Sequence, residues 1–172
     1  MNLLISKTVT TDIVTELVTV DDAKLWLKIS FAEDDTILAS LIKAARLYLE
    51  NLTNFALGAK TIEIIVDLDY TESYYLPAPL TAILTFTRWD GSAFVANTGY
   101  YLFRNSLAID ESGRYKITLT CGYTVLPNDF KTDILKLVAW NYQNRGLDFS
   151  NENTSLVDFP KLASEYYKQV VI

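Results

Sequence analysis

Residues 115–146, YKITLTCGYTVLPNDFKTDILKLVAWNYQNRG, contain a strand pattern followed directly by a helix pattern. The segment YKITLTCGY is rich in β-branched and aromatic residues, which is typical of a strand. Pro127 stands where a helix should begin, because proline fits the first turn of a helix. Arg145 and Gly146 predict its end, since a cation in the last turn followed by glycine favours a helix C-terminus. The chain therefore passes here from a β region into its last long helix.

The residues upstream, from 60 to 125, predict an antiparallel β subdomain. Four more segments are rich in strand-forming residues and are separated by turn formers: TIEIIVDLD, AILTFTRW, GYYLF and LAID. Asp90 and Gly91 predict a hairpin between AILTFTRW and SAFV, because both residues tolerate the positive φ angles of a tight turn. Pro77 and Pro79 cannot donate ladder hydrogen bonds, so the LPAPL segment is expected at a sheet edge or in a loop.

The residues before the β region predict two helices. Thr19, followed by two acids, forms a capping-box-like start for a short helix that runs to about Ile29. Asp34 or Asp35 should cap a longer helix that ends near Asn54 and is about 30 Å long. Its apolar face comprises Leu38, Leu41, Ile42, Ala45, Tyr48, Leu49 and Leu52, and Ile37, Ala44 and Leu47 widen it. This width predicts a second packing partner, either the sheet of the same chain or a neighbouring subunit.

The order helix, strands, helix predicts an α+β fold. We expect a small helical bundle of two long helices plus short helices, with an inserted antiparallel β subdomain. The 172 residues suit a single domain. Within it we predict an extended N-terminal arm over 1–18, a helical body over 19–56 and 126–172, and the β subdomain over 60–125. A short terminal helix is expected over 159–168.

Composition argues against most enzyme classes and against tight nucleic-acid binding. The sequence has no histidine, which is the commonest general base and zinc ligand. Its net charge of -6 would repel a phosphate backbone. Cys121 lies in a strand pattern and is expected to be a buried thiol. The absence of a basic leader and of an apolar span predicts a protein made in the cytoplasm, without membrane contact.

The acidic clusters do not require a catalytic or metal site. Asp21 with Asp22, and the run Glu33, Asp34 and Asp35, are best explained as helix caps, and Asp67 and Asp69 as solvent-exposed residues at a strand end. No phosphate loop, dinucleotide glycine pattern, CxxC pair or EF-hand spacing occurs. We therefore predict no enzyme activity, cofactor or metal. A hydrolase that uses two carboxylates stays open as an alternative.

Aromatic residues make up 13% of the chain, and some should face partners because Tyr and Trp are favoured in interfaces. Trp140 is the clearest case, since helical periodicity places it on the polar stripe with Asp133, Lys136 and Gln143. It is expected either to lie under a loop or the terminal helix, or to anchor a protein interface. A β-rich binding module for carbohydrate or protein is the second functional interpretation.

Several segments, in their order along the chain, resemble the head-tail connector (adaptor) family of tailed bacteriophages. VTVDDAKLWLKI followed by EDDTILASLIKAARLYLENLTNFAL is similar to the family's opening helices. LPAPLTAILTFTRWDGS resembles its proline-led strand and hairpin. TGYYLF and the closing block, with Gly122, Tyr123 and the YQNR ending, resemble its last strands and helix. Trp140 and Asn141 depart from the aliphatic residues usual there, which leaves the interface details open.

The resemblance implies a structural virion protein at the head-tail junction, with a role in head completion. It implies a homo-oligomer, a dodecameric ring in the virion, that joins the portal protein to tail or head-closure proteins. Genomic DNA would pass through this channel without specific binding. Ring closure needs a heterologous interface, in which one surface meets a different surface of the next copy. Our candidates are Lys43, Arg46 and Tyr48 on the long helix, against the last helix around Trp140.

Overall fold

The computed structural model describes residues 2–144, and the chain divides into two compact units. The first, the β unit, comprises residues 1–15 and 55–125. The second, the helical unit, comprises residues 16–54 and, among the described residues, 126–144. The predicted terminal helix over 159–168 and the predicted helix end at Arg145 and Gly146 lie outside the described residues.

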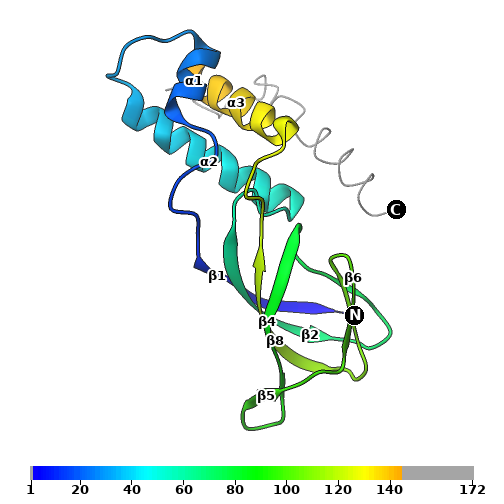
Figure 1. Ribbon diagram of the computed structural model, residues 1–172. Helices are drawn as coiled ribbons and strands as arrows, with labels where there is room; N and C mark the ends of the chain where they lie inside the picture. Colours follow the sequence, from blue (N-terminus) through cyan, green and yellow to red (C-terminus); the bar gives the residue numbers. More distant parts are fainter. Residues whose placement is uncertain (1, 145–172) are drawn as a thin grey trace, which may run out of the picture. The chain divides into compact units, whose positions relative to one another are not determined.

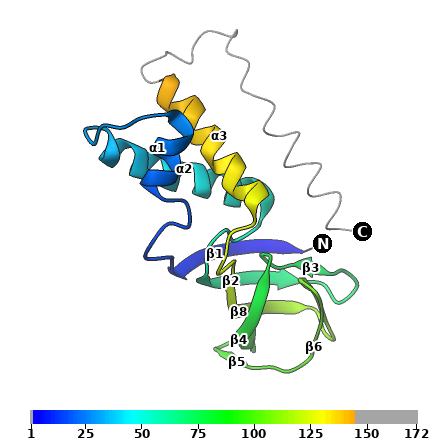
Figure 2. The ribbon, with the colours of Figure 1, turned by 45° about the horizontal axis from the view of Figure 1, so that its top comes forward.

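The β unit is built on a five-stranded antiparallel sheet (Figures 1 and 2). Its central pair, β2 and β8, is in continuous register from Lys60 opposite Cys121 to Leu68 opposite Gly113. In order across the sheet the strands are β1 (Leu3–Thr11), β2 (Lys60–Leu68), β8 (Gly113–Cys121), β4 (Leu80–Trp89) and β5 (Phe94–Ala96).

Alternation along the central strands creates the core of the β unit. Every second residue of β2 is buried, and the register sets Ile62 and Ile64 opposite Leu119 and Ile117 on the same face. Side chains of this size stabilise the fold by about 1.5 to 3 kcal/mol each when they are fully buried. The intervening residues of β2 are only partly buried, so the core lies on one face of this sheet.

A smaller three-stranded sheet adds its side chains to the same core. Leu107 and Ile109 belong to the core cluster, and the ring of Tyr100 lies 4.5 Å from that of Phe86. Tyr115 also stacks on Phe86, and the centroids of their rings are 4.9 Å apart. In order across the small sheet the strands are β3 (Tyr74–Tyr75), β7 (Ser106–Ile109) and β6 (Tyr100–Phe103).

The helical unit contains α1 (Val20–Leu27), α2 (Asp35–Thr53) and α3 (Asn128–Gln143), which pack against one another. The predicted cap of the first helix is confirmed. The Thr19 hydroxyl accepts a hydrogen bond from the Asp22 N–H, and the Asp22 carboxylate accepts one from the Thr19 N–H. Asp34 precedes α2 but makes no side-chain cap, because its carboxylate instead accepts a hydrogen bond from the Tyr142 hydroxyl of α3.

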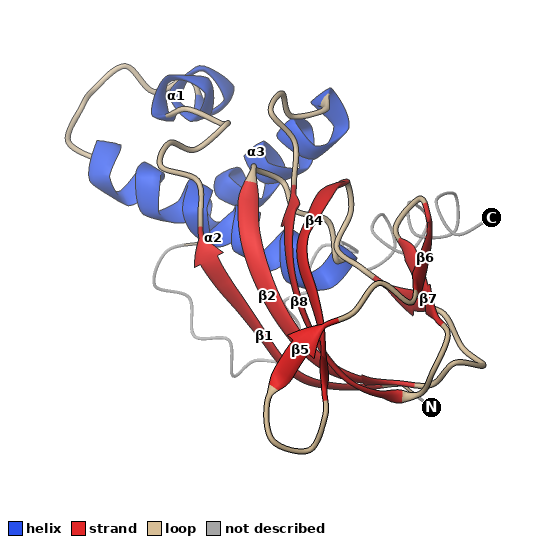
Figure 3. Cartoon of the chain, turned by 60° about the horizontal axis from the view of Figure 1, so that its bottom comes forward, coloured by secondary structure: helices blue, strands red, loops and turns tan. Residues whose placement is uncertain are grey.

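The prediction of an α+β helical bundle with two long helices and an inserted β subdomain is wrong. The described residues form eight strands in two antiparallel sheets and only three helices, so the architecture is predominantly β (Figure 3). The physical reason lies in the N-terminal segment, which has no clear hydrophobic period. Its residues 3–11 form β1 and extend the large sheet beyond β2 through backbone hydrogen bonds, which alternation in sequence does not reveal.

Other local predictions are confirmed. β4 and β5 pair in an antiparallel hairpin around Asp90 and Gly91, and Gly91 has a φ of +107°. The Asp90 carboxylate accepts hydrogen bonds from the N–H groups of Ser92 and Ala93, which closes this turn. Cys121 is a buried thiol at the end of β8 and forms no disulfide.

Gly122 allows two backbone segments of the β unit to approach each other closely. Its φ is +110°, and a Cβ at this position would lie 2.0 Å from the carbonyl oxygen of Gly58. Its N–H also donates a hydrogen bond of 2.9 Å to the carbonyl of Pro79. Only glycine both adopts this positive φ readily and leaves room for the Gly58 carbonyl. Gly122 of the sequence motif therefore has a packing role at the end of β8.

We expect Gly122→Ala to lower the free energy of unfolding by more than about 3 kcal/mol, because it adds a steric clash to backbone strain. Gly91→Ala is the matched control. Gly91 has a similar φ of +107° and no atom within 4 Å of its Cβ position, so only the strain of about 1 to 2 kcal/mol should remain. Urea unfolding of both variants measures the difference, and equal losses would contradict the clash.

Candidate subunit interface

Helix α2 has one face that packs inside the helical unit. The buried residues recur at helical spacing, and they face the apolar side of α3, which includes Phe130, Ile134 and Val138. The apolar residues of α2 on this face are Leu38, Ile42, Ala45 and Leu49. This packing buries four of the ten residues in the wide apolar surface that the sequence of α2 predicts.

Arg46 lies at the buried side of α2, where only 2% of its surface is exposed. Its Nε and Nη2 atoms donate to the two carboxylate oxygens of Glu16, at 2.8 and 3.1 Å. Its Nη1 donates to Glu50, one turn further along α2, at 3.1 Å. A buried guanidinium needs such partners, because an uncompensated charge in the interior is costly. Arg46 therefore links Glu16, at the beginning of the helical unit, to α2.

A second apolar surface of α2 stays exposed. Ile37, Ala44, Tyr48 and Leu52 are exposed and Leu41 is partly buried, with Tyr48 exposing 47% of its surface. The spacing of three or four residues puts all five on one line along the helix, and we call this line the α2 stripe. Apolar residues in such a continuous line mark an interaction surface more often than scattered ones do.

The four interface candidates from the sequence therefore lie in different settings. Tyr48 is part of the α2 stripe, and Lys43 is exposed on the same helix but off that line. Arg46 is buried in its ion pairs. Trp140 is partly buried on α3, at helical spacing from the Asp133 and Lys136 ion pair. The structure does not bring these four side chains together into one surface.

Sequence reasoning missed a second apolar surface, at the end of α1. Leu25 exposes 82% of its surface, and Trp26 and Phe31 are also exposed. We call these three residues the α1 patch. Trp26 lies next to Leu27, where α1 ends, and Lys28 then turns the chain with a φ of 58°.

Ion pairs connect the three helices of the helical unit. Lys131 of α3 contacts Asp22 of α1 at 2.8 Å, and Lys24 of α1 contacts Asp35 of α2 at 2.9 Å. The hydrogen bond from Lys131 is the main cause that lowers the pKa of Asp22 below its usual value, and the Thr19 backbone N–H adds to it. These contacts hold α1 in place while its α1 patch stays exposed.

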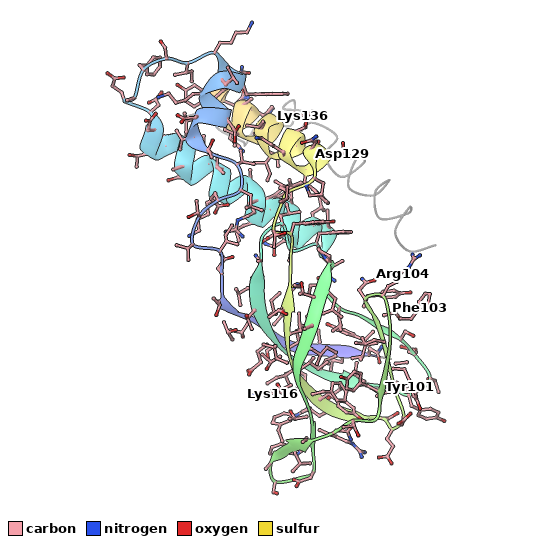
Figure 4. The ribbon with its side chains drawn as sticks, viewed as in Figure 1. Tyr101, Phe103, Arg104, Lys116, Asp129 and Lys136 are labelled. Atoms are coloured by element: carbon pink, nitrogen blue, oxygen red, sulfur yellow. The ribbon has the colours of Figure 1, made fainter. Side chains whose placement is uncertain are left out.

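In the β unit, a cluster of exposed aromatic residues marks the β6–β7 hairpin. Phe103 exposes 76% of its surface, and Tyr101 is exposed on the same strand. Arg104, at the tip of the hairpin, has a φ of 57° and lies over the Phe103 ring at 5.8 Å. Figure 4 shows Tyr101, Phe103 and Arg104 along the outer side of this hairpin. We call these three residues the hairpin tip.

Within residues 2–144, no three side chains of metal-ligating type come together as a metal site. Nor does this part of the chain include a helix with the length and apolar character needed to cross a membrane.

Arg46→Met should lower the free energy of unfolding by about 3 kcal/mol, because it leaves two carboxylates without their shared buried partner. Lys43→Met, on the exposed side of the same helix, is the matched control and should change it by less than about 0.5 kcal/mol. Urea unfolding gives both values. Unchanged stability together with lost self-association would instead assign Arg46 to an interface.

Acid should weaken the contact between α1 and α3. Because the folded pKa of Asp22 lies below its ordinary value of 3.8, the contribution of its charge is present above that value. It is then lost as the pH falls through the folded pKa. Asp22→Asn should lower the free energy of unfolding by about 1 kcal/mol at neutral pH and by less at pH 3. Asp21→Asn, in the same turn, is the control, and an equal loss at both pH values would contradict this role.

The sequence matches the head completion protein family over residues 16–155. Among solved structures, a chain from the virion of the native gene transfer agent (GTA) particle has a TM-score of 0.72 and 19% identity, and the alignment covers 95% of both chains. A chain from the neck of the empty GTA particle, computed with C6 symmetry, has a TM-score of 0.71 and 18% identity over 95% of both chains.

A third chain, from the neck of the native GTA particle computed with C12 symmetry, has a TM-score of 0.68 and 19% identity. The alignment covers 92% of this protein and 94% of that chain. No curated protein matches the sequence. At these identities the solved structures establish a shared fold. The family match spans most of the protein, so the chain belongs to the head completion protein family, which confirms the head-tail connector family inferred from its sequence motifs.

Proposed function

We propose that this protein is a structural, non-enzymatic subunit that assembles with copies of itself into a ring at the head-tail junction of a virion. Membership of the head completion protein family is the observation that carries this proposal. Two of the similar solved chains come from necks computed with C6 and C12 symmetry, which supports a ring with many identical contacts, twelve in a dodecamer. The protein would be made in the host cytoplasm and act in the assembled particle.

The α2 stripe is the best candidate for one side of the contact between neighbours. A ring closes through a heterologous interface, so the stripe must meet a different surface of the next copy. The α1 patch and the region around Trp140 are the candidates for that surface, because both present aromatic side chains suited to interface cores. Lys43 would lie at the margin of the contact, and Arg46 would support it by holding α2 in place.

The hairpin tip is the candidate contact to other virion proteins. Exposed Tyr, Phe and Arg side chains have the composition of interaction hot spots. We assign this surface to the portal protein or to tail and head-closure proteins, because the β unit offers it separately from the helical surfaces proposed for self-assembly.

The net negative charge of the protein fits a ring through which DNA passes. The net charge of -6 disfavours adhesion to the phosphate backbone, so genomic DNA would pass through the ring without specific binding. Neither a cofactor nor a membrane is part of this function.

We expect Tyr48→Ala and Trp140→Ala each to raise the concentration needed for self-assembly by about tenfold or more, as for interface anchors that contribute about 1.4 kcal/mol or more. Tyr48→Ala should change thermal stability little, because about half of its surface, 47%, is already exposed. Mass photometry and sedimentation velocity, with the protein alone and with portal protein, measure assembly, and thermal melting measures folding.

Tyr75→Ala is the matched control, since it removes a tyrosine of similar exposure, 51%, from β3, outside the contacts proposed for self-assembly and for other virion proteins. A Trp140→Ala variant that assembles like the wild type but melts at a lower temperature would show that Trp140 belongs to the core. Rings that form equally well with both substitutions would argue against the helical surfaces as the interface.

A further inference from the structure

The five-stranded sheet has two open edges. Strand β1 pairs with β2 on one side, and no described strand pairs with its other side. Strand β4 pairs with β8 along most of its length, but β5 covers only residues 87–89 of its outer side. Asn97 donates a hydrogen bond to the Phe86 carbonyl, which leaves residues 80–85 as the open part of β4. An open edge presents backbone groups that can pair with another strand.

The two edges match on the core face of the sheet. On β1, the register places Leu4 and Val9 opposite buried residues of β2, and both are exposed. On β4, it places Leu80 and Ile83 opposite buried residues of β8, and both are only partly buried. The apolar row of the core therefore continues to both edges, although on β1 it is interrupted by Lys7, which lies opposite the buried Ile64.

The two edges also match on the opposite face. There β1 presents Ser6 and Thr8, and the open part of β4 presents Ala82 and Thr85, all small residues. Lys7 is the only charged residue of β1, and residues 80–85 carry no charge. Lys7 lies on the core face of β1 and would limit pairing with a strand that carries positive charge, whereas residues 80–85 offer an uncharged partner. No proline interrupts either edge. Each of the two strands has two register shifts, which increase local twist.

We propose that β1 of one copy pairs antiparallel with residues 80–85 of β4 in the next copy, so that the sheet continues from subunit to subunit. All neighbours in the sheet order are antiparallel, so a β1 strand added beside β4 keeps the same alternation. Two different edges of the same chain meet, which is the heterologous contact that a ring needs. This inference rests on the proposed ring and adds a backbone-mediated contact to the helical one.

Cysteine cross-linking tests the pairing directly. Aligning the centres of the two edges places Thr8 near Ala82, on the same face of the extended sheet. A mixture of Thr8→Cys and Ala82→Cys proteins should form disulfide-linked dimers on oxidation, and the double variant should form a ladder of higher oligomers. Thr8→Cys with Val14→Cys is the control, because Val14 is fully exposed outside both edges and reports random collisions.

Three outcomes would overturn the pairing. Cross-links in Thr8→Cys protein alone would show β1 paired with β1, and cross-links at the level of the Val14→Cys control would show no pairing. The third comes from Val9→Lys and Leu84→Lys, which add charge at exposed positions of the two edges. They should raise the concentration for half-assembly about tenfold, whereas Val14→Lys should not. Ring assembly that is unaffected by both substitutions would refute the strand contact but not the proposed ring.

A wild-type chain that forms no ring, even with portal protein, would refute the proposed function as well.

Discussion

The antiparallel pairing of β2 with β8 is the interaction on which the rest of the structure depends. It joins segments that lie about fifty residues apart, in a continuous register from Lys60 opposite Cys121 to Leu68 opposite Gly113. Because side chains alternate between the two faces, a slip of one residue would move the whole buried row to solvent. The same pairing brings Gly122 against Gly58, and the small sheet packs on the buried row that it creates.

The helical unit is held together differently. Its helices share an apolar interface, but three polar contacts determine how α1 and the preceding segment attach: Arg46 with Glu16 and Glu50, Lys131 with Asp22, and Lys24 with Asp35. The buried charge of Arg46 is costly unless it finds its partners, so it favours the arrangement in which Glu16 and Glu50 reach it. The other apolar residues of this unit, the α2 stripe and the α1 patch, stay largely exposed.

A ring subunit needs surfaces that a monomer would hide, and both units of this chain have them. The helical unit presents side-chain surfaces, which provide affinity through apolar burial. The β unit presents open strand edges, whose hydrogen bonds specify direction and register more strictly than apolar contacts do. In the proposed ring, the apolar contacts and the strand pairing would complement each other. The hairpin tip, with its aromatic and cationic side chains, is left for partners of a different kind.

Local sequence determined much of this protein. The Thr19 cap, the helix after Pro127, the Asp90 and Gly91 hairpin and the buried Cys121 each follow from residues close together in the chain, because caps, turns and alternation are short-range effects. The order of these motifs was also sufficient to indicate the family. Tyr48 was found as a candidate because a wide apolar helix face can be counted from the sequence.

Only the tertiary structure decided the architecture and the composition of the candidate interface. The pairing of residues 3–11 with β2 depends on backbone hydrogen bonds to a strand fifty residues away, so no local pattern indicated a predominantly β fold. Helical periodicity places Arg46 with the polar residues of α2, but in the folded chain it is buried in an ion pair with Glu16, thirty positions earlier. Periodicity states which residues share a face of a helix. Whether that face is covered depends on long-range contacts between distant segments of the folded chain.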